Sequence, residues 1–98
     1  MDRATILSTA AEYVCKDRDA QYGSAENNFA LIGRLWTEYL HSVPDDDEYA
    51  DSITAHDVAV MMALLKVARI ATGKPKADNY IDLAGYIACA GEIACRNV

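Results

Sequence analysis

The chain has 98 residues, of which 52% are hydrophobic and 24% charged, and its formal net charge at pH 7 is −6. This length predicts a single domain, residues 1–98, and the high apolar content excludes intrinsic disorder. The negative charge argues against binding of duplex nucleic acid, because that function needs a basic face to displace counterions from phosphates.

Turn signals divide the chain into four segments that are typical of helices. The first segment covers about residues 3–17. Its apolar side chains recur at helical spacing, so they share one face that we expect to point inward. They are Ile6, Leu7, Ala10, Ala11 and Val14.

The second predicted helix covers about residues 25–40, and Ser24 before it is of the residue type that caps a helix N-terminus. One arc of this helix is apolar and carries most of the large side chains of the segment. We expect that arc to face the core. It holds Phe29, Ile32, Leu35, Trp36 and Tyr39.

The third predicted helix begins at Thr54, which can cap it, and Asp57 favours its positive N-terminal end. It continues to about Thr72, because Gly73 is a good stop signal. The fourth predicted helix covers about residues 76–96. Since no alternating run is long enough for a sheet, the sequence predicts an all-α, four-helix domain.

The third and fourth predicted helices are apolar over more of their circumference than one side of a small bundle can cover. Residues 58–65 are all apolar, and most of the fourth helix outside one polar stripe is apolar too. Small residues, Ala84, Gly85, Ala88 and Gly91, would let another helix approach closely. We therefore expect a homo-oligomer, most simply a dimer; the alternative is a monomer with an Ala-rich core.

Membrane insertion and export are not expected. The longest apolar run, residues 58–65, is far shorter than the roughly 20 residues that cross a bilayer, and no long apolar block follows the first residues. Cys15, Cys89 and Cys95 are an odd number at spacings unlike a zinc or disulfide framework. They indicate an intracellular, reducing compartment and three buried thiols.

Polar side chains interrupt the apolar face of each predicted helix near one end. Arg18 follows the first helix, Asn28 lies within the apolar arc of the second, and Lys66 and Arg69 lie near the end of the third. Tyr22 lies in the first turn. Because the connections are short, these ends can converge into a pocket with polar groups. The fourth helix would add Asp78, Asn79, Asp82 and Tyr86.

Each of these residues also has a purely structural interpretation. Cations in the last turns of a helix complement its dipole, and Asp78 can cap the next helix. Ion pairs such as Arg18 with Asp82, or Arg69 with Asp78, can fix the register of a bundle. A set of five such groups at one end favours a site over five separate structural roles.

Nearly the whole length of the chain carries an ordered set of motifs: RDxxYG at 18–23, NF at 28–29, LW at 35–36, ITxxDVAxMMxxxKxAR at 53–69 and DNxxDxxGY at 78–86. By this set the chain resembles a domain of unknown function that is common in phages and prophages. It is more distantly similar to the all-α nucleotide pyrophosphohydrolases of the MazG-like type, and to phage proteins associated with nucleotide modification.

This resemblance implies a helical oligomer with nucleotide sites between helices, in a phage or prophage setting and hence in the cytoplasm of a bacterial host cell. It also implies which residues line the site. They are Arg18, Tyr22, Asn28, Lys66, Arg69, Asp78, Asp82 and Tyr86.

The chain departs from the MazG-like pattern in its acidic residues. Those enzymes hold Mg²⁺ with a Glu-x-x-Glu on one helix and an acidic pair on the next, and this chain contains no Glu-x-x-Glu. Asp78 and Asp82, with Asp57 on another helix, are few oxygen ligands for a hard cation that must activate water. We therefore assign no catalytic residue and expect no firm cofactor.

The sequence thus favours binding of a nucleotide or other phosphorylated small molecule, with sequestration of a nucleotide signal as its use. Arg18, Lys66 and Arg69 would contact phosphate. Tyr22 or Tyr86 would stack on a base, and Asn28 or Asn79 would contact its edge. Two alternatives stay open: a divergent Mg²⁺-dependent pyrophosphohydrolase using Asp78 and Asp82, and a structural or protein-interaction module with internal ion pairs.

Overall fold

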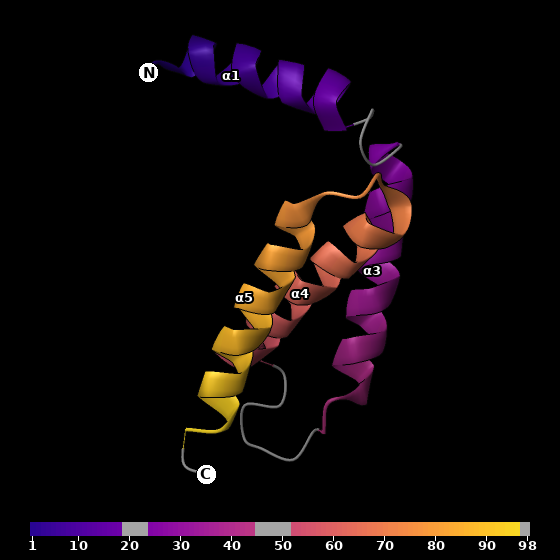
Figure 1. The fold of residues 1–98 in the computed structure, drawn as a ribbon, viewed down its shortest axis with the longest axis vertical. Coiled ribbons are helices and arrows are strands. Elements are labelled where there is room, and N and C mark those ends of the chain that lie inside the picture. Colours follow the sequence, from indigo (N-terminus) through magenta and orange to yellow (C-terminus); the bar gives the residue numbers. More distant parts are fainter. Residues whose placement is uncertain (19–23, 45–51, 97–98) are drawn as a thin grey trace.

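The computed structural model describes residues 1–18, 24–44 and 52–96, and all regular structure in these residues is helical (Figure 1). The predicted all-α class and its four helices are confirmed. The first helix changes from α- to π-helical geometry before it ends. The elements are α1 (Arg3–Glu12), the π-helical segment η1 (Tyr13–Arg18), α3 (Ala25–Ser42), α4 (Ala55–Thr72) and α5 (Ala77–Ala94).

Side-chain caps determine where three of the helices begin. The Asp2 carboxylate accepts the Thr5 backbone N–H at 2.9 Å before α1. Ser24 caps α3 by accepting a backbone N–H, and Thr54 caps α4 in a reciprocal capping box with Asp57. The predicted caps Ser24 and Thr54 are therefore confirmed, and each satisfies a donor that the first helical turn would leave without a partner. The suggested cap Asp78 is wrong, because the N-cap residue of α5 is Lys76, which makes no side-chain cap bond.

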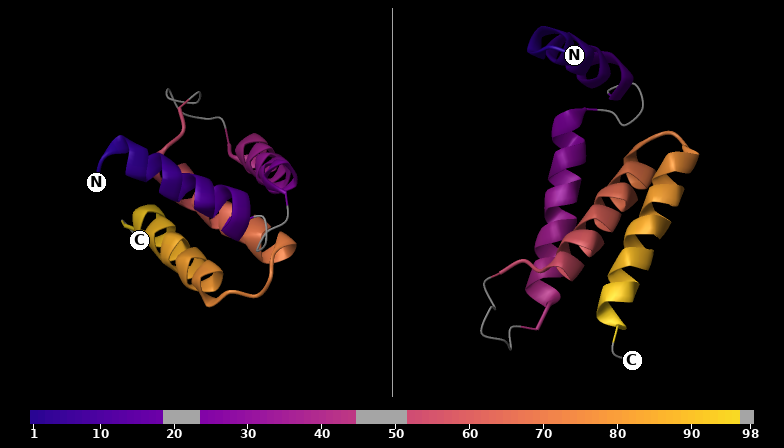
Figure 2. Two further views of the ribbon diagram at one scale, coloured as in Figure 1. Left: turned by 90° about the horizontal axis from the view of Figure 1, so that it is seen from above. Right: turned by 90° about the vertical axis from the view of Figure 1, so that its left-hand side faces the viewer.

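Helices α3, α4 and α5 lie side by side in one layer, with α4 in the middle (Figures 1 and 2). α4 packs on both neighbours. α1 lies beyond the end of the layer at which α3 begins, and none of its residues is buried. Most domains bury their apolar faces between two packed layers, whereas these three helices form only one.

The apolar core of the described residues is small for so hydrophobic a chain. All of its fully buried apolar residues lie on α3, α4 and α5, and three of them are alanines. They are Ile32, Met61, Ala63, Ala68 and Ala90. Leu35, Trp36 and Tyr39 are half-buried on the predicted inward arc of α3.

Three predictions of burial are wrong. The apolar face of the first helix is exposed, including Ile6, Leu7 and Val14, and Phe29 on α3 is 65% exposed. Cys15, Cys89 and Cys95 are also exposed rather than buried. The physical reason is common to all three: helical spacing shows which side chains share a face, but burial requires another element to cover that face.

Two hydrogen bonds join α3 to α4 in the part of the layer farther from the start of α3. The Trp36 indole Nε1 donates to the Met61 carbonyl oxygen at 2.7 Å, and the Tyr39 hydroxyl donates to Asp57 Oδ1 at 2.8 Å. Loss of hydration, and then the bond to the Asp57 carboxylate, raise the pKa of Tyr39 to about 12. These bonds fix how α3 sits along α4.

We expect the capping carboxylate of Asp57 to contribute a pH-dependent part of the stability. Hydrogen bonds from the Thr54 backbone, and then from Tyr39 and the Thr54 side chain, lower the Asp57 pKa below 3.8 against the opposing effect of burial. A lowered folded pKa stabilises the fold above the unfolded pKa, and this stabilisation is lost as pH falls through the folded value.

The measurement is urea denaturation of the wild type and Asp57→Asn between pH 7 and pH 2.5. At neutral pH the variant should be less stable by about 1 kcal/mol, a typical value for a helix cap. Below pH 4 the difference should shrink as the wild-type carboxylate becomes protonated. A difference that stays constant over this range would contradict the assignment.

Candidate functional site

The start of α3, the end of α4 and the start of α5 meet at one end of the layer (Figure 1). This arrangement follows from the alternating direction of the three helices. It carries Asn28, Lys66, Arg69, Asn79 and Asp82 toward the same end, as their positions in the predicted helices had suggested. Of the other candidates, Arg18 ends η1 but its side chain lies outside the described residues, and so does Tyr22.

The central polar contact at this end is an ion pair between α4 and α5. Lys66 Nζ lies 2.8 Å from Asp82 Oδ2; the Lys66 side chain is 11% exposed and that of Asp82 is 45% exposed. The two ion pairs named from the sequence did not include Lys66, and the one between Arg18 and Asp82 stays a prediction because the Arg18 side chain lies outside the described residues. The reason for the observed pair is the register of the hairpin: residues equally distant from the turn at Gly73–Pro75 lie opposite each other, and Lys66 and Asp82 are such a pair.

Asn28 has a structural role at this end. It is 5% exposed, and its Nδ2 donates to Thr72 Oγ1 at 2.8 Å. The Thr72 hydroxyl in turn donates to the Ala68 carbonyl oxygen at 2.8 Å. This chain of bonds attaches the first turn of α3 to the last turn of α4. Thr72 was not a candidate, and the only signal for it was its position at the helix end.

Asn79 differs from the other polar residues at this end. It is 2% exposed, yet its Nδ2 has no hydrogen-bond acceptor within the part of the chain that the structure describes. Its backbone N–H donates to the Lys76 carbonyl oxygen at 3.1 Å. A buried amide donor without an acceptor costs about 1–3 kcal/mol, and each such group in a native protein calls for an explanation.

The remaining candidates surround Asn79 on α4 and α5. By the same hairpin register that pairs Lys66 with Asp82, Arg69 stands at the level of Asn79, and its Nε is buried. Asp78 is exposed, and Tyr86 is half-buried two turns further along α5. This end of the layer therefore holds hydrogen-bond donors that are buried or half-buried, on Lys66, Arg69 and Asn79. It also holds two carboxylates: that of Asp78 is exposed, and that of Asp82 forms the ion pair with Lys66.

The acidic residues at this end are few within residues 1–18, 24–44 and 52–96. No group of three His, Cys, Asp or Glu side chains that could hold a metal ion occurs there. Asp78 and Asp82 lie one turn apart on α5, but Asp57 begins α4 and so lies at the opposite end of the layer. The acidic ligands considered from the sequence are thus not brought together.

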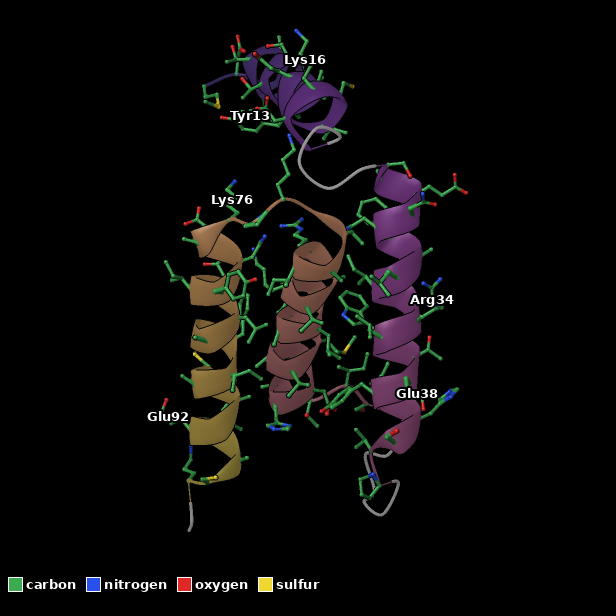
Figure 3. The ribbon with its side chains drawn as sticks, turned by 45° about the vertical axis from the view of Figure 1, so that its right-hand side comes forward. Tyr13, Lys16, Arg34, Glu38, Lys76 and Glu92 are labelled. Carbon is green, nitrogen blue, oxygen red and sulfur yellow. The ribbon has the colours of Figure 1, made fainter. Side chains whose placement is uncertain are left out.

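Three charged side chains away from this end, those of Arg34, Glu38 and Glu92, point outward. Figure 3 shows Arg34 and Glu38 on the outer side of α3 and Glu92 near the far end of α5, while Lys76 stands where α5 begins. Lys76 is the N-cap residue of α5 and makes no side-chain cap bond. None of the described helices is both long enough and apolar enough to cross a membrane.

Comparison with known proteins gives a family without an assigned activity. The family described as "Domain of unknown function (DUF6378)" matches residues 5–94. The chain is similar to the Gene 55 protein of Mycobacterium phage L5, with 39% identity over 82 residues, or 84% of this chain and 47% of that protein. It is also similar to the Gene 55 protein of Mycobacterium phage D29, with 32% identity over 89 residues, or 91% and 53%.

The chain thus spans about half the length of these two relatives. No solved structure matches it. The comparisons therefore identify a group of phage proteins and assign no chemistry to them.

Proposed function

This chain belongs to the phage-protein family described as Domain of unknown function (DUF6378), and we propose that it binds a nucleotide or other phosphorylated small molecule at the end of the layer where α4 meets α5. In this proposal the protein sequesters its ligand in the cytoplasm of a bacterial host and does not turn it over. The ligand contacts come from the end of α4 and the start of α5.

The observation that supports this proposal is the buried Nδ2 of Asn79, which lacks an acceptor among the described residues. The groups on the facing turns of α4 are Lys66 and Arg69, which are also donors and carry positive charge. A site made of donors fits a ligand rich in acceptor oxygens, and phosphate offers such oxygens together with a complementary negative charge.

A Mg²⁺-dependent pyrophosphohydrolase of the MazG-like type is less well supported. It would use Asp78 and Asp82 to hold the metal. Asp82 lies 2.8 Å from the Lys66 ammonium, and that positive charge disfavours a divalent cation at the same carboxylate. Hard cations also take about six oxygen ligands, of which these two residues supply few. Release of pyrophosphate by the wild type, lost in Asp82→Asn, would favour this alternative instead.

A thermal-shift screen tests the binding proposal. The purified protein is melted with inorganic phosphate, pyrophosphate, nucleoside mono-, di- and triphosphates and cyclic dinucleotides, and material released by heating is run on anion-exchange chromatography. A ligand at a hundred times its Kd stabilises the folded state by about 2.7 kcal/mol, which gives an increase in Tm of several degrees in a domain of this size.

Asn79→Leu separates a ligand contact from a structural role. The variant removes a buried donor that lacks an acceptor in the described chain, so the unliganded protein should be as stable as the wild type or more stable. The ligand-induced shift should disappear. Asn27→Leu, at an exposed position on α3, is the control and should keep the shift. If no ligand of the panel shifts the wild type and no species is released on heating, the proposal is wrong.

A second function, self-assembly as a homo-oligomer, is favoured by a different observation. Large apolar side chains are exposed on every helix of the described chain, among them Leu7, Phe29, Val58 and Ile81. Such a surface is typical of proteins that bury part of it against a partner. This second function does not require the ligand, and the two can be tested separately.

A further inference from the structure

The chain leaves more surface in contact with solvent than a folded monomer of this mass usually has. The accessible surface is 7254 Å², whereas a monomer of 10.7 kDa is expected to expose about 5500 Å². The radius of gyration is 16.2 Å, compared with about 13 Å for a compact chain of this length. The difference of roughly 1700 Å² per chain exceeds the 600–1000 Å² that each partner buries in a standard interface.

The outer side of α5 is the most continuous apolar part of this surface. The side facing α4 carries Asn79, Leu83, Tyr86 and Ala90, which are buried or half-buried. At 100° per residue the charged side chains of α5 fall together on a separate arc. Between these two arcs lies a third without any charge, which we call the outer face. Its exposed residues are Tyr80, Ile81, Ala84, Ile87, Ala88, Gly91 and Cys95.

The space beside Gly91 on this outer face is open within the described chain. A Cβ built at this position meets no atom within 4 Å, so no close approach inside the chain requires glycine. Gly91 lies in the last turn of α5, and glycine is a poorer helix former than alanine. A small residue at this position is explained if a side chain from outside the chain lies against it.

The spacing of the outer face fits a second copy of the same helix. When two α5 helices pack antiparallel about a two-fold axis at the level of Tyr86, residues whose numbers are equally far from 86 come opposite each other. Ile81 of one copy then faces Gly91 of the other, so a large side chain meets the smallest one. Ala84 faces Ala88, and these small residues let the helices approach closely at the centre.

From this complementarity we propose that two copies of the chain associate through the outer face of α5, with the two α5 helices antiparallel. The proposal specifies the surface for the self-assembly proposed above, and the ligand site plays no part in it. In this dimer, α5 of each copy packs on α4 of its own chain and on the antiparallel α5 of the other copy.

A pair of arginine substitutions at adjacent positions tests this surface. Ala88 lies on the outer face and Cys89 lies on the charged arc, and both are exposed within the chain. Light scattering coupled to size-exclusion chromatography, over a range of protein concentrations, should show a dimer for the wild type and for Cys89→Arg. Ala88→Arg should be a monomer with an unchanged helical circular dichroism spectrum, because only the dimer buries this position.

Gly91→Leu provides a second test, in case Ala88→Arg alters the fold. The larger side chain would meet Ile81 of the other copy and should raise the dimer Kd at least tenfold, while the monomer keeps its helicity because the position is open. A wild type that is monomeric at every concentration would overturn both self-assembly and its surface. A dimer that persists in Ala88→Arg and Gly91→Leu would overturn the α5 surface alone.

Discussion

Replacing Trp36 with alanine is expected to lower the free energy of unfolding by about 3 kcal/mol, a large part of the stability of a small domain. The half-buried indole ring lies between α3 and α4, and its Nε1 donates to the Met61 carbonyl oxygen at 2.7 Å. Because the buried apolar core of the described chain consists of five residues, three of them alanines, the ring supplies a large share of the apolar contact between the helices.

Urea denaturation followed by far-ultraviolet circular dichroism measures this loss without relying on tryptophan fluorescence. Trp36→Phe keeps most of the ring but not the bond, so it should lose only about 1 kcal/mol. Phe29→Ala is the matched control, because Phe29 is an aromatic residue of the same helix that is exposed within the chain, and it should change the stability of the monomer by less than about 0.5 kcal/mol. If Trp36→Ala and Phe29→Ala lowered the free energy of unfolding by the same amount, this account of the core would be contradicted.

The ends of the helices could be predicted from the sequence because the signals that set them are local. Ser24 and Thr54 cap the helices that follow them, and α4 ends at Thr72 just before Gly73. In each case the deciding hydrogen bond joins residues within one helical turn. No knowledge of the rest of the fold is needed to identify such a cap or stop.

Burial could not be predicted in the same way, because it depends on which element lies opposite. Leu7 and Phe29 each belong to an apolar face of the expected spacing, yet no other part of the described chain covers them. Ile32, on the same face of α3 as Phe29, is 5% exposed because α4 lies against that part of the helix. The pattern therefore identified the faces, whereas the single-layer arrangement decided which of them became core.

The sequence predicted which helix ends form the candidate site, but it did not predict which side chains contact each other there. The sequence indicated that Asn28, Lys66 and Asp82 come to one end of the bundle, and α3, α4 and α5 bring them there. The partner of Lys66 depends on the length of the turn between α4 and α5. Whether Asn79 Nδ2 is buried without an acceptor depends on how closely the neighbouring side chains pack. The spacing of residues along the sequence does not determine that packing.

Breaking the ion pair from its acidic side is expected to be the most damaging change at the candidate site. Asp82→Leu would leave the Lys66 ammonium 11% exposed and without its carboxylate partner. Loss of one partner costs about 3–5 kcal/mol in a buried pair and up to about 1 kcal/mol at the surface. Since Asp82 is itself 45% exposed, we expect a loss of about 2 kcal/mol in urea denaturation.

Removing the cation, or both charges, should have a different effect. Lys66→Met leaves Asp82 partly hydrated and should cost less than about 1 kcal/mol, and the double variant Lys66→Met/Asp82→Leu should regain most of the stability that Asp82→Leu loses, because apolar residues can replace a buried ion pair. Lys74→Met, at an exposed position in the turn, is the control for loss of one positive charge.

The same variants separate a binding role of Lys66 from a purely structural one. If Lys66 contacts a phosphorylated ligand, the double variant should be stable and yet lose the thermal shift, while Lys74→Met keeps it. If the ion pair only fixes the register of α4 and α5, the double variant should keep both its stability and any ligand response. A double variant that remains as unstable as Asp82→Leu would contradict this account of the ion pair. In that case two apolar side chains at these positions would not have restored the free energy of unfolding, so the unpaired Lys66 charge would not be the cause of the loss.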